Sequence, residues 1–416
     1  MSHPLSAIMT TISSNPPPTP DFYLYPPAPI QRTEISPEGD WVTLFWDDDS
    51  VLTCYYLWLQ ENDIDQGGID RATREGLLDP AELVLERTIH NAFVDESGHL
   101  CVEWHKGPLS HFNSGWLKTL AAGQHRAGAF IPLSIPWRRA DLEAPPKHCA
   151  KRVQSDAHAM AAWLNDLARY GVTLLDNAPT QPEFLLNFAE SIGPIRDSNF
   201  GRLWDVHADQ ALAGKAETNS TANTGLRLGP HADLPTRQLP PAFQFLHCLR
   251  NEAVGGASTL CDSLAIIEHL KAYQPDDLKQ LTSSRWIFFN RGPGLDHRWS
   301  GPIIDFSGAG RNPVIRAFYP VKAFPDMPQR EVPSAYQALK RFQQLAASDQ
   351  FELRLTLQPG QILCFDNHRI LHGRDAFAAQ GVRHLQGIYI DRDEIDCRTR
   401  VANRLADHSP APSKER

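Results

Sequence analysis

The spacing of apolar residues along the chain changes character near residue 149. Between residues 36 and 125, short apolar runs such as WVTLFW, VLTCYYLWLQ and HLCVEW alternate with turn-forming residues, which is typical of short β-strands. From residue 149 on, apolar residues recur at helical spacing in SDAHAMAAWLNDLARYG and PEFLLNFAESIG, and each of these runs closes on a glycine. The pattern therefore predicts a small β-rich domain followed by a larger domain of different construction.

Beyond residue 240 most segments are strand-like. Two helical stretches, near 263–273 and 333–347, interrupt short runs that are separated by turn signals, including the Pro-Gly of LQPGQIL. The strand-like runs are AFQFLHCLR, STLCDS, RWIFFN, PVIRAFY, FELRLTL, QILCFD and HLQGIYID. Many short strands with turns between them favour a mainly β fold with flanking helices, built as a barrel or a double-sheet jelly roll.

The connecting segments are rich in proline. Residues 1–35 contain NPPPTP and YPPAP and predict an extended or disordered tail, because such a composition cannot build a core. Residues 126–148 are Pro-rich and aperiodic, and they predict a linker. The expected order is a tail (1–35), a small β-rich domain (36–125), a linker (126–148), the main domain (149–403) and a C-terminal tail (404–416).

Composition narrows the class of protein. The 416 residues are 42% hydrophobic and 21% charged, with a formal net charge of −9, which is ordinary for a globular protein. An acidic chain without a long Lys/Arg run argues against binding to nucleic acid or to anionic membranes. There is no signal-peptide pattern and no long apolar span, and the seven cysteines form no CxxC motif. We therefore expect a cytoplasmic protein with reduced thiols.

The triplet His-Ala-Asp occurs twice, at His207 and at His231. Residues i and i+2 of a strand share a face, so His231 and Asp233 can point at one metal ion. A remote histidine, His372 in DNHRILHGR, offers a third ligand. Two histidines and one carboxylate form the facial triad of non-haem Fe(II) oxygenases, which leaves positions open for a cosubstrate and O₂.

Two further residues fit a chelating 2-oxo acid. Arg383 lies eleven residues after His372, and arginine can hold a carboxylate through two parallel hydrogen bonds. Ser258, in GGAS, lies twenty-seven residues after His231 and adds a hydroxyl. The corresponding distance from His207 reaches Leu234 and no such segment, so we interpret His207 as structural or near the site.

These motifs together resemble the taurine dioxygenase superfamily of Fe(II)/2-oxoglutarate oxygenases. PPAFQFLHCLRNEAVGGAS, PGQILCFDNHRILHGR and VRHLQGIY are similar to its γ-butyrobetaine hydroxylase and trimethyllysine hydroxylase branch, and the similarity spans roughly residues 40–400. The resemblance implies a double-stranded β-helix domain, supportive ascorbate and a homodimer. It also implies that Fe(II) is held by His231, Asp233 and His372, and 2-oxoglutarate by Arg383 and Ser258.

The N-terminal domain departs from that branch. The cysteine ligands of the branch's structural zinc match Asp63, Asp65 and Gly68 here, while His111 matches the histidine ligand. Structural zinc prefers thiolate and imidazole, so two carboxylates and one histidine make a poor site. We expect no structural zinc, and a domain held by its apolar core alone.

The substrate pocket departs as well. The branch surrounds a trimethylammonium group with aromatic faces, which attract a quaternary cation. By motif, Phe200, Trp204 and Tyr389 retain such faces, whereas Asn223 and Leu234 replace two of them. Further possible anion contacts are Arg316, Tyr319 and Lys322. We expect hydroxylation of a small polar metabolite, zwitterionic or anionic and without a trimethylammonium head, with succinate and CO₂ as coproducts.

Three alternatives stay open on the sequence. The chain can be a γ-butyrobetaine or trimethyllysine hydroxylase, if the matching of the two replaced positions is misaligned. The same cofactor chemistry can give desaturation, cyclisation or bond cleavage in secondary metabolism. A catalytically silent jelly-roll binding protein would be favoured only by a missing ligand, and none of the three is missing.

Overall fold

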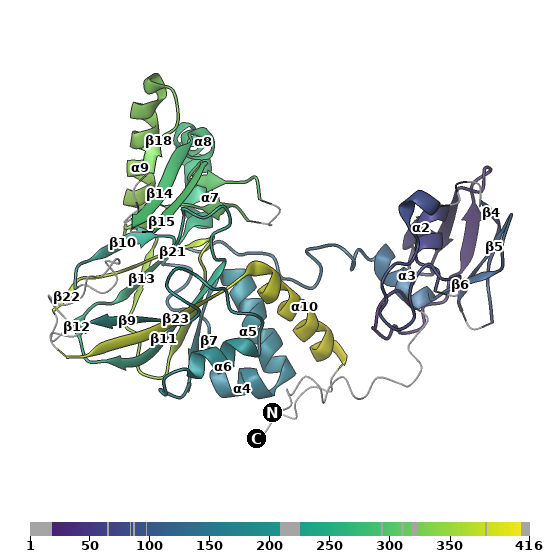
Figure 1. Cartoon of the computed structure of the whole chain (residues 1–416), viewed down its shortest axis with the longest axis horizontal. Helices are drawn as coiled ribbons and strands as arrows, with labels where there is room; N and C mark the ends of the chain where they lie inside the picture. The colour runs from purple at the N-terminus through teal and green to yellow at the C-terminus, as the bar shows by residue number, and fades with distance from the viewer. Residues whose placement is uncertain are drawn as a thin grey trace. The chain divides into compact units, whose positions relative to one another are not determined.

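The computed structural model (Figure 1) describes residues 19–64, 66–83, 85, 88–96, 98–208, 225–292, 294–308, 312–317, 321, 323–378 and 381–408. The chain divides into two compact units, residues 1–129 and 130–416, and each is described by itself. Both are rich in β-strands and carry helices. Within the described ranges, no helix is long and apolar enough to cross a bilayer.

The first unit contains two antiparallel three-stranded sheets, β1-β2-β3 and β4-β5-β6. Its elements are β1 (Arg32–Ile35), β2 (Trp41–Phe45), β3 (Val51–Tyr55), α2 (Tyr56–Glu61), β4 (Ile89–Val94), β5 (Leu100–Trp104), β6 (Ser110–Phe112) and α3 (Ser114–Ala121). Alternate residues of the strands, among them Val42, Leu44 and Leu100, are fully buried against the two helices. The period-2 pattern of the sequence thus becomes one apolar core.

Two expectations for this unit are wrong. The run VLTCYYLWLQ is not one strand, because β3 stops at Tyr55 and residues 56–61 form α2, which buries Tyr56, Leu59 and Gln60 at helical spacing. The predicted tail 1–35 ends too late, since residues 32–35 pair with β2 and Ile30 is buried in the core. Residues 1–18 lie outside the described residues.

The second unit is built on two large sheets. The six-stranded sheet has the order β7-β8-β20-β11-β23-β9, and the four-stranded sheet has the order β10-β21-β13-β19. All neighbours are antiparallel except the pair β7 and β8. The strands are β7 (Lys147–Cys149), β8 (Val172–Asp176), β9 (Trp204–Ala208), β10 (Leu228–His231), β11 (Phe243–Asn251), β13 (Ser258–Asp262), β19 (Glu352–Leu355), β20 (Ile362–Asp366), β21 (Ile370–Arg374) and β23 (Arg383–Ile390).

Alternation along these strands separates two apolar layers. Leu363, Phe365 and Leu385 of the six-stranded sheet share one core with Leu260 and Leu353 of the four-stranded sheet. The opposite face of the six-stranded sheet packs against α4 (Ala150–Ser155), α5 (Ala157–Tyr170), α6 (Phe184–Glu190) and α10 (Arg392–His408). The faces that meet are therefore the inner faces, and residues directed inward on β10, β21, β13, β11 and β23 can reach one site.

Helix α5 shows how closely the local sequence sets its ends. Asp156 precedes the helix and accepts hydrogen bonds from the backbone N–H groups of His158 and Ala159. Gly171 ends the helix in the left-handed conformation, with φ of 71°, and β8 follows directly. The prediction of a helix closing on Gly171 is confirmed.

A further layer lies beside the four-stranded sheet. It consists of β14 (Trp286–Gly292), β15 (Leu295–Gly301) and β18 (Ala323–Pro325) with α7 (Ser263–Tyr273), α8 (Pro275–Ser283) and α9 (Val332–Ala346). The helices predicted near 263–273 and 333–347 are α7 and α9. The run PVIRAFY forms only a two-residue strand, β17 (Val314–Ile315).

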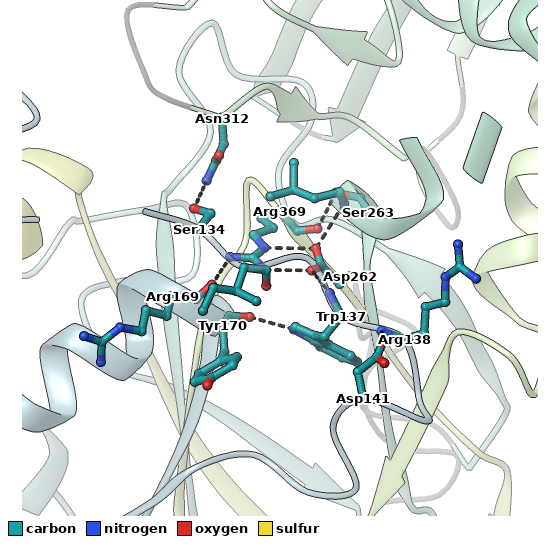
Figure 2. A network of polar contacts seen from close by, with 12 residues as sticks. Ser134, Trp137, Arg138, Asp141, Arg169, Tyr170, Asp262, Ser263, Asn312 and Arg369 are labelled. Carbon is teal, nitrogen blue, oxygen red and sulfur yellow. Dashed lines mark hydrogen bonds and ion pairs between the residues drawn. The ribbon is translucent and has the colours of Figure 1, made fainter. Parts of the chain in front are cut away.

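The predicted linker 126–148 belongs partly to the second unit. Trp137 is 1% exposed, and its backbone N–H donates to Asp262 at 3.0 Å while its indole N–H donates to the Tyr170 carbonyl at 2.7 Å (Figure 2). The predicted C-terminal tail also begins too early, because α10 continues to His408. Few apolar residues mark this helix, but Ile395 and Ala402 bury one face of it.

Candidate metal and cosubstrate site

The two candidate histidines face each other across adjacent strands. His231 ends β10 and is the direct register partner of His372 in β21, with ring centroids 4.2 Å apart. The Nδ1–H of His231 donates to the Gly229 carbonyl at 2.9 Å, which leaves Nε2 free to bind a metal. Burial and the neighbouring His231 lower the pKa of His372 to about 3, so His372 is neutral near pH 7.

Asp233 closes the third corner of this site from the loop after β10. Its Oδ1 lies 3.5 Å from Nε2 of His231 and 3.7 Å from Nε2 of His372. Tyr389 donates its hydroxyl to the other oxygen, Oδ2, at 2.7 Å. Burial raises the pKa of Asp233, but the neighbouring imidazoles of His372 and His231 and the hydrogen bond from Tyr389 outweigh it, so the pKa lies below its ordinary value. The three potential ligand atoms lie within 4.8 Å of one another.

Asn367 fixes the backbone of Asp233, and the sequence analysis missed it. The Asp233 N–H donates to Oδ1 of Asn367 at 2.7 Å, and Nδ2 of Asn367 donates to the carbonyls of Asp233 at 3.1 Å and Pro241 at 2.9 Å. Asn367 is 1% exposed. A buried amide directly after the apolar run QILCFD was the signal available for it, because such a group needs partners.

Buried arginines lie beside the histidines. Arg383 begins β23 and is 4% exposed, and its Nε and Nη1 have no hydrogen-bond partner among the described residues. Ser258 begins β13 as the register partner of Arg374, which donates to the Leu226 carbonyl at 2.9 Å. An unmatched buried guanidinium indicates a bound anion, since a charge is otherwise costly to bury. The sequence analysis missed Arg374, although its spacing of two from His372 places it on the same face.

One cavity of about 160 Å³ joins these groups. Its walls are formed by the three candidate ligands, Ser258, Arg374 and Arg383, with Phe200, Trp204, Asp205, Val206, Leu228, Gln244, Leu246, Gly373, Leu385 and Tyr389. The rings of Trp204 and Tyr389 lie 5.4 Å apart. Gly387 is required beside them, because a Cβ there would come within 2.3 Å of the Trp204 ring. The cavity therefore has a cationic part and an aromatic part.

Several sequence candidates are not brought to this cavity. Leu234 adopts a left-handed conformation, with φ of 51°, and is not among the lining residues. Arg316 is directed into the protein, where it donates to the carbonyls of Pro235, Arg237 and Gln238 at 2.7 to 3.0 Å. It therefore holds a loop instead of contacting an anion. Asn223, Tyr319 and Lys322 lie outside the described residues.

His207, which opens the first His-Ala-Asp triplet, lies away from the three candidate ligands. His207 lies on β9 opposite His384 of β23, with ring centroids 4.9 Å apart, and it does not line the cavity. Asp209 lies outside the described residues. Of the two triplets, the structure gathers only the second with His372.

Asp63, one of the positions matched to zinc ligands, belongs to a buried hydrogen-bonded network. Asp63 is fully buried, and it accepts from the Ser110 hydroxyl and from the backbone N–H of Gln66 at 3.0 Å. Trp104 donates to the Ser110 hydroxyl at 2.8 Å. The expectation of a domain held by its apolar core alone is therefore wrong. Asp65 lies outside the described residues.

His111 is separated from Asp63 in the structure. It follows Ser110 on β6, so alternation directs it to the opposite face of the sheet, where it pairs with Cys101 of β5. Its ring nitrogen, the Cys101 sulfur and an Asp95 oxygen lie within 4.8 Å of one another. The expectation that the matched positions hold no structural zinc stays a prediction.

Known proteins resemble the chain over most of its length. A γ-butyrobetaine dioxygenase of Pseudomonas sp. (strain AK-1) is 35% identical over 375 residues, covering 87% of this chain and 94% of the relative. Dioxygenase str8 of Strobilurus tenacellus is 30% identical and covers 83% and 84%, respectively. The mitochondrial trimethyllysine dioxygenase of Mus musculus is 26% identical and covers 83% and 82%.

The region that matches a known family coincides with the unit that holds the site. Residues 145–389 match the family described as taurine catabolism dioxygenase TauD, TfdA family. This range contains the three candidate ligands, Ser258 and Arg383. It also begins at β7 and ends at Tyr389, and so includes both large sheets. The chain belongs to the TauD, TfdA family of dioxygenases.

Proposed function

We propose that the second unit is a double-stranded β-helix dioxygenase that binds Fe(II) through His231, Asp233 and His372. The observation that carries the proposal is the convergence of two imidazole nitrogens and one carboxylate oxygen beside Arg383, whose buried Nε and Nη1 have no hydrogen-bond partner among the described residues. Two imidazoles and one carboxylate suit Fe(II) and leave part of its coordination sphere open. When bound, Fe(II) with 2-oxoglutarate and O₂ supplies the oxidising power that hydroxylates an unactivated C–H bond, with succinate and CO₂ as coproducts.

The protein's own residues orient these partners. Arg383 binds the distal carboxylate of 2-oxoglutarate with Ser258 beside it, which satisfies the unmatched guanidinium. The Gly229 carbonyl fixes the tautomer of His231, and Asn367 with Tyr389 fixes Asp233.

The aromatic part of the cavity receives the prime substrate, in this proposal a small polar metabolite without a trimethylammonium head. Among the described residues, the aromatic faces of this cavity are those of Trp204, Tyr389 and the 41%-exposed Phe200, and Leu234 adds none. Each aromatic face is worth about 0.5–2 kcal/mol to a quaternary cation, so a site with fewer faces binds it more weakly. A homodimer, expected from the resemblance, stays a prediction.

γ-Butyrobetaine hydroxylation is the second candidate, favoured by the relative from Pseudomonas sp. that is 35% identical over 375 residues. Trimethyllysine hydroxylation has weaker support of the same kind. Desaturation, cyclisation or bond cleavage would use the same metal and cosubstrate, and identifying the product by mass spectrometry distinguishes them from hydroxylation.

The test is succinate formation from 2-oxoglutarate with Fe(II) and ascorbate. We expect His231→Ala, Asp233→Ala and His372→Ala to abolish succinate formation while the protein remains folded by circular dichroism. His207→Ala is the matched control, since it changes the other His-Ala-Asp triplet on the same unit and should retain activity. Unchanged succinate formation in His231→Ala would refute the assignment of His231 as a ligand. A wild type that forms no succinate would instead favour a catalytically silent binding protein.

A further inference from the structure

Gln244 is a buried amide on the wall of the cavity that the proposed function leaves unexplained. It lies on β11, is 2% exposed, and its Oε1 has no hydrogen-bond partner among the described residues. Its neighbours on the same strand, Phe243 and Phe245, are directed to the face of the six-stranded sheet that packs against the helices, so Gln244 is directed to the opposite, inner face. Buried polar groups in native proteins are almost always hydrogen-bonded, so this amide indicates a ligand.

The register of the six-stranded sheet places Gln244 at the metal site. Its direct partners are Phe365 on β20 and Tyr389 on β23. The Phe365 ring packs against the His372 ring, with centroids 4.7 Å apart, and Tyr389 donates to Asp233. Gln244 thus lies between the two residues of its sheet that contact candidate metal ligands.

The same register separates Gln244 from Arg383 along the sheet. Tyr389, the partner of Gln244, lies six residues after Arg383 on β23, and these span about 20 Å at the rise of an antiparallel strand. The two side chains therefore approach the site from opposite directions. A 2-oxo acid whose distal carboxylate is bound by Arg383 presents its other end, the chelating one, toward the metal and Gln244.

Resting on the proposed function, we infer that Gln244 hydrogen-bonds the 2-oxo carboxylate end of the cosubstrate. A half-turn of the terminal amide presents Nε2–H to a carboxylate oxygen, and a hydrogen bond to an ionised acceptor is stronger than one between neutral groups. Arg383 would then read the distal carboxylate, which distinguishes 2-oxoglutarate from shorter 2-oxo acids. Gln244 would hold the part that all 2-oxo acids share.

The experiment measures binding without turnover. Dissociation constants of 2-oxoglutarate and of pyruvate, which lacks the distal carboxylate, are determined by calorimetry on the Mn(II)-loaded protein without O₂. The variants are Gln244→Leu, Arg383→Met and, as matched control, Gln386→Leu. Gln386 undergoes the same change on the opposite face of the same sheet, where it accepts from the Glu183 N–H at 3.1 Å and donates to Asp205.

We expect Gln244→Leu to weaken both ligands by the same factor, roughly tenfold or more. Arg383→Met should weaken 2-oxoglutarate alone, and Gln386→Leu should change neither. If Gln244→Leu does not fold, Gln244→Glu keeps the shape and should weaken both ligands through repulsion between carboxylates.

Equal affinities of wild type and Gln244→Leu for both ligands, with 2-oxoglutarate weakened in Arg383→Met, would overturn this inference and leave the proposed function intact. If the wild type itself does not bind 2-oxoglutarate, the proposed function fails together with the inference.

Discussion

The ion pair between Arg369 and Asp262 offers a direct test of what holds the metal site in place (Figure 2). Arg369 precedes His372 by three residues, and Asp262 ends β13, the strand beside β21. Their side chains are 1% and 0% exposed and are joined by two hydrogen bonds of 2.9 and 2.7 Å. Arg369 also donates to the carbonyls of Arg169 and Ile135, at 2.8 and 2.7 Å. We predict that Arg369→Met strongly destabilises the second unit.

The magnitude follows from burial. Removing one partner of a buried ion pair leaves an uncompensated charge and costs about 3–5 kcal/mol. Among the described residues, Asp262 would keep the backbone N–H groups of Trp137 and Leu264, each at 3.0 Å. The carbonyls of Arg169 and Ile135 would each lose one hydrogen bond, although that of Arg169 still accepts from the Ile135 N–H at 2.7 Å. We therefore expect the upper part of this range, a large share of the roughly 5–15 kcal/mol by which a typical domain is stable.

Urea unfolding followed by tryptophan fluorescence measures this loss, since the buried Trp137 reports on the second unit. The double variant Asp262→Asn/Arg369→Met removes the stranded charge and should recover part of the stability. Arg298→Met is the control, because its partner Asp296 and Arg298 itself are about half exposed, so it should cost less than about 1 kcal/mol. A loss below about 1 kcal/mol in Arg369→Met, or no recovery in the double variant, would refute the reasoning.

The remaining predictions concern the two ligands and the first unit. Arg383→Ala should raise the Michaelis constant for 2-oxoglutarate roughly 30-fold or more, because a buried carboxylate that loses a charged partner costs about 2–5 kcal/mol; a change in the prime-substrate constant alone would contradict this. γ-Butyrobetaine and trimethyllysine should be poor substrates in steady-state assays, and rapid turnover of either would instead favour a γ-butyrobetaine or trimethyllysine hydroxylase. Zinc at the matched positions is not expected, so Asp63→Asn should leave the metal content unchanged by elemental analysis while lowering stability, since the buried carboxylate bonds Ser110; zinc lost with Asp63 would show the opposite.

The sequence allowed prediction of those site residues whose chemical type points to a metal or a carboxylate. His231, Asp233, His372 and Arg383 have functional groups that a metal or a carboxylate requires, and their spacing along the chain separated His231 from His207. Helix α5 could be predicted for a similar reason, since Asp156 and Gly171 mark its ends. Helix α10 could not be predicted in the same way, because most of its residues are charged or polar. The few apolar ones, such as Ile395, are recognised as core residues only from their packing in the folded unit.

What the sequence did not provide was the pairing of segments far apart along the chain. The contact of Asn367 with Asp233 joins residues 134 positions apart. Asn367 lies in the turn that connects β20 to β21, and Asp233 lies in the loop after β10, so only the folded chain brings them together. Arg316 was misread because a free arginine and one bound to three carbonyls have the same sequence signal. The linker was misread likewise, since only the folded unit shows Trp137 donating to Asp262.

The sheet register also explains how one scaffold can serve different substrates. The cationic part of the cavity comes from both large sheets: Ser258 and Arg374 lie on the paired strands β13 and β21, and Arg383 lies at the start of β23 in the six-stranded sheet. The aromatic part comes from Phe200, before β9, and from Trp204, which packs on Gly387. In the proposed function the cosubstrate and the prime substrate contact different parts of this cavity, so changes around Phe200 should alter the substrate while cosubstrate binding persists. Relatives of 26 to 35% identity with different named substrates fit this separation.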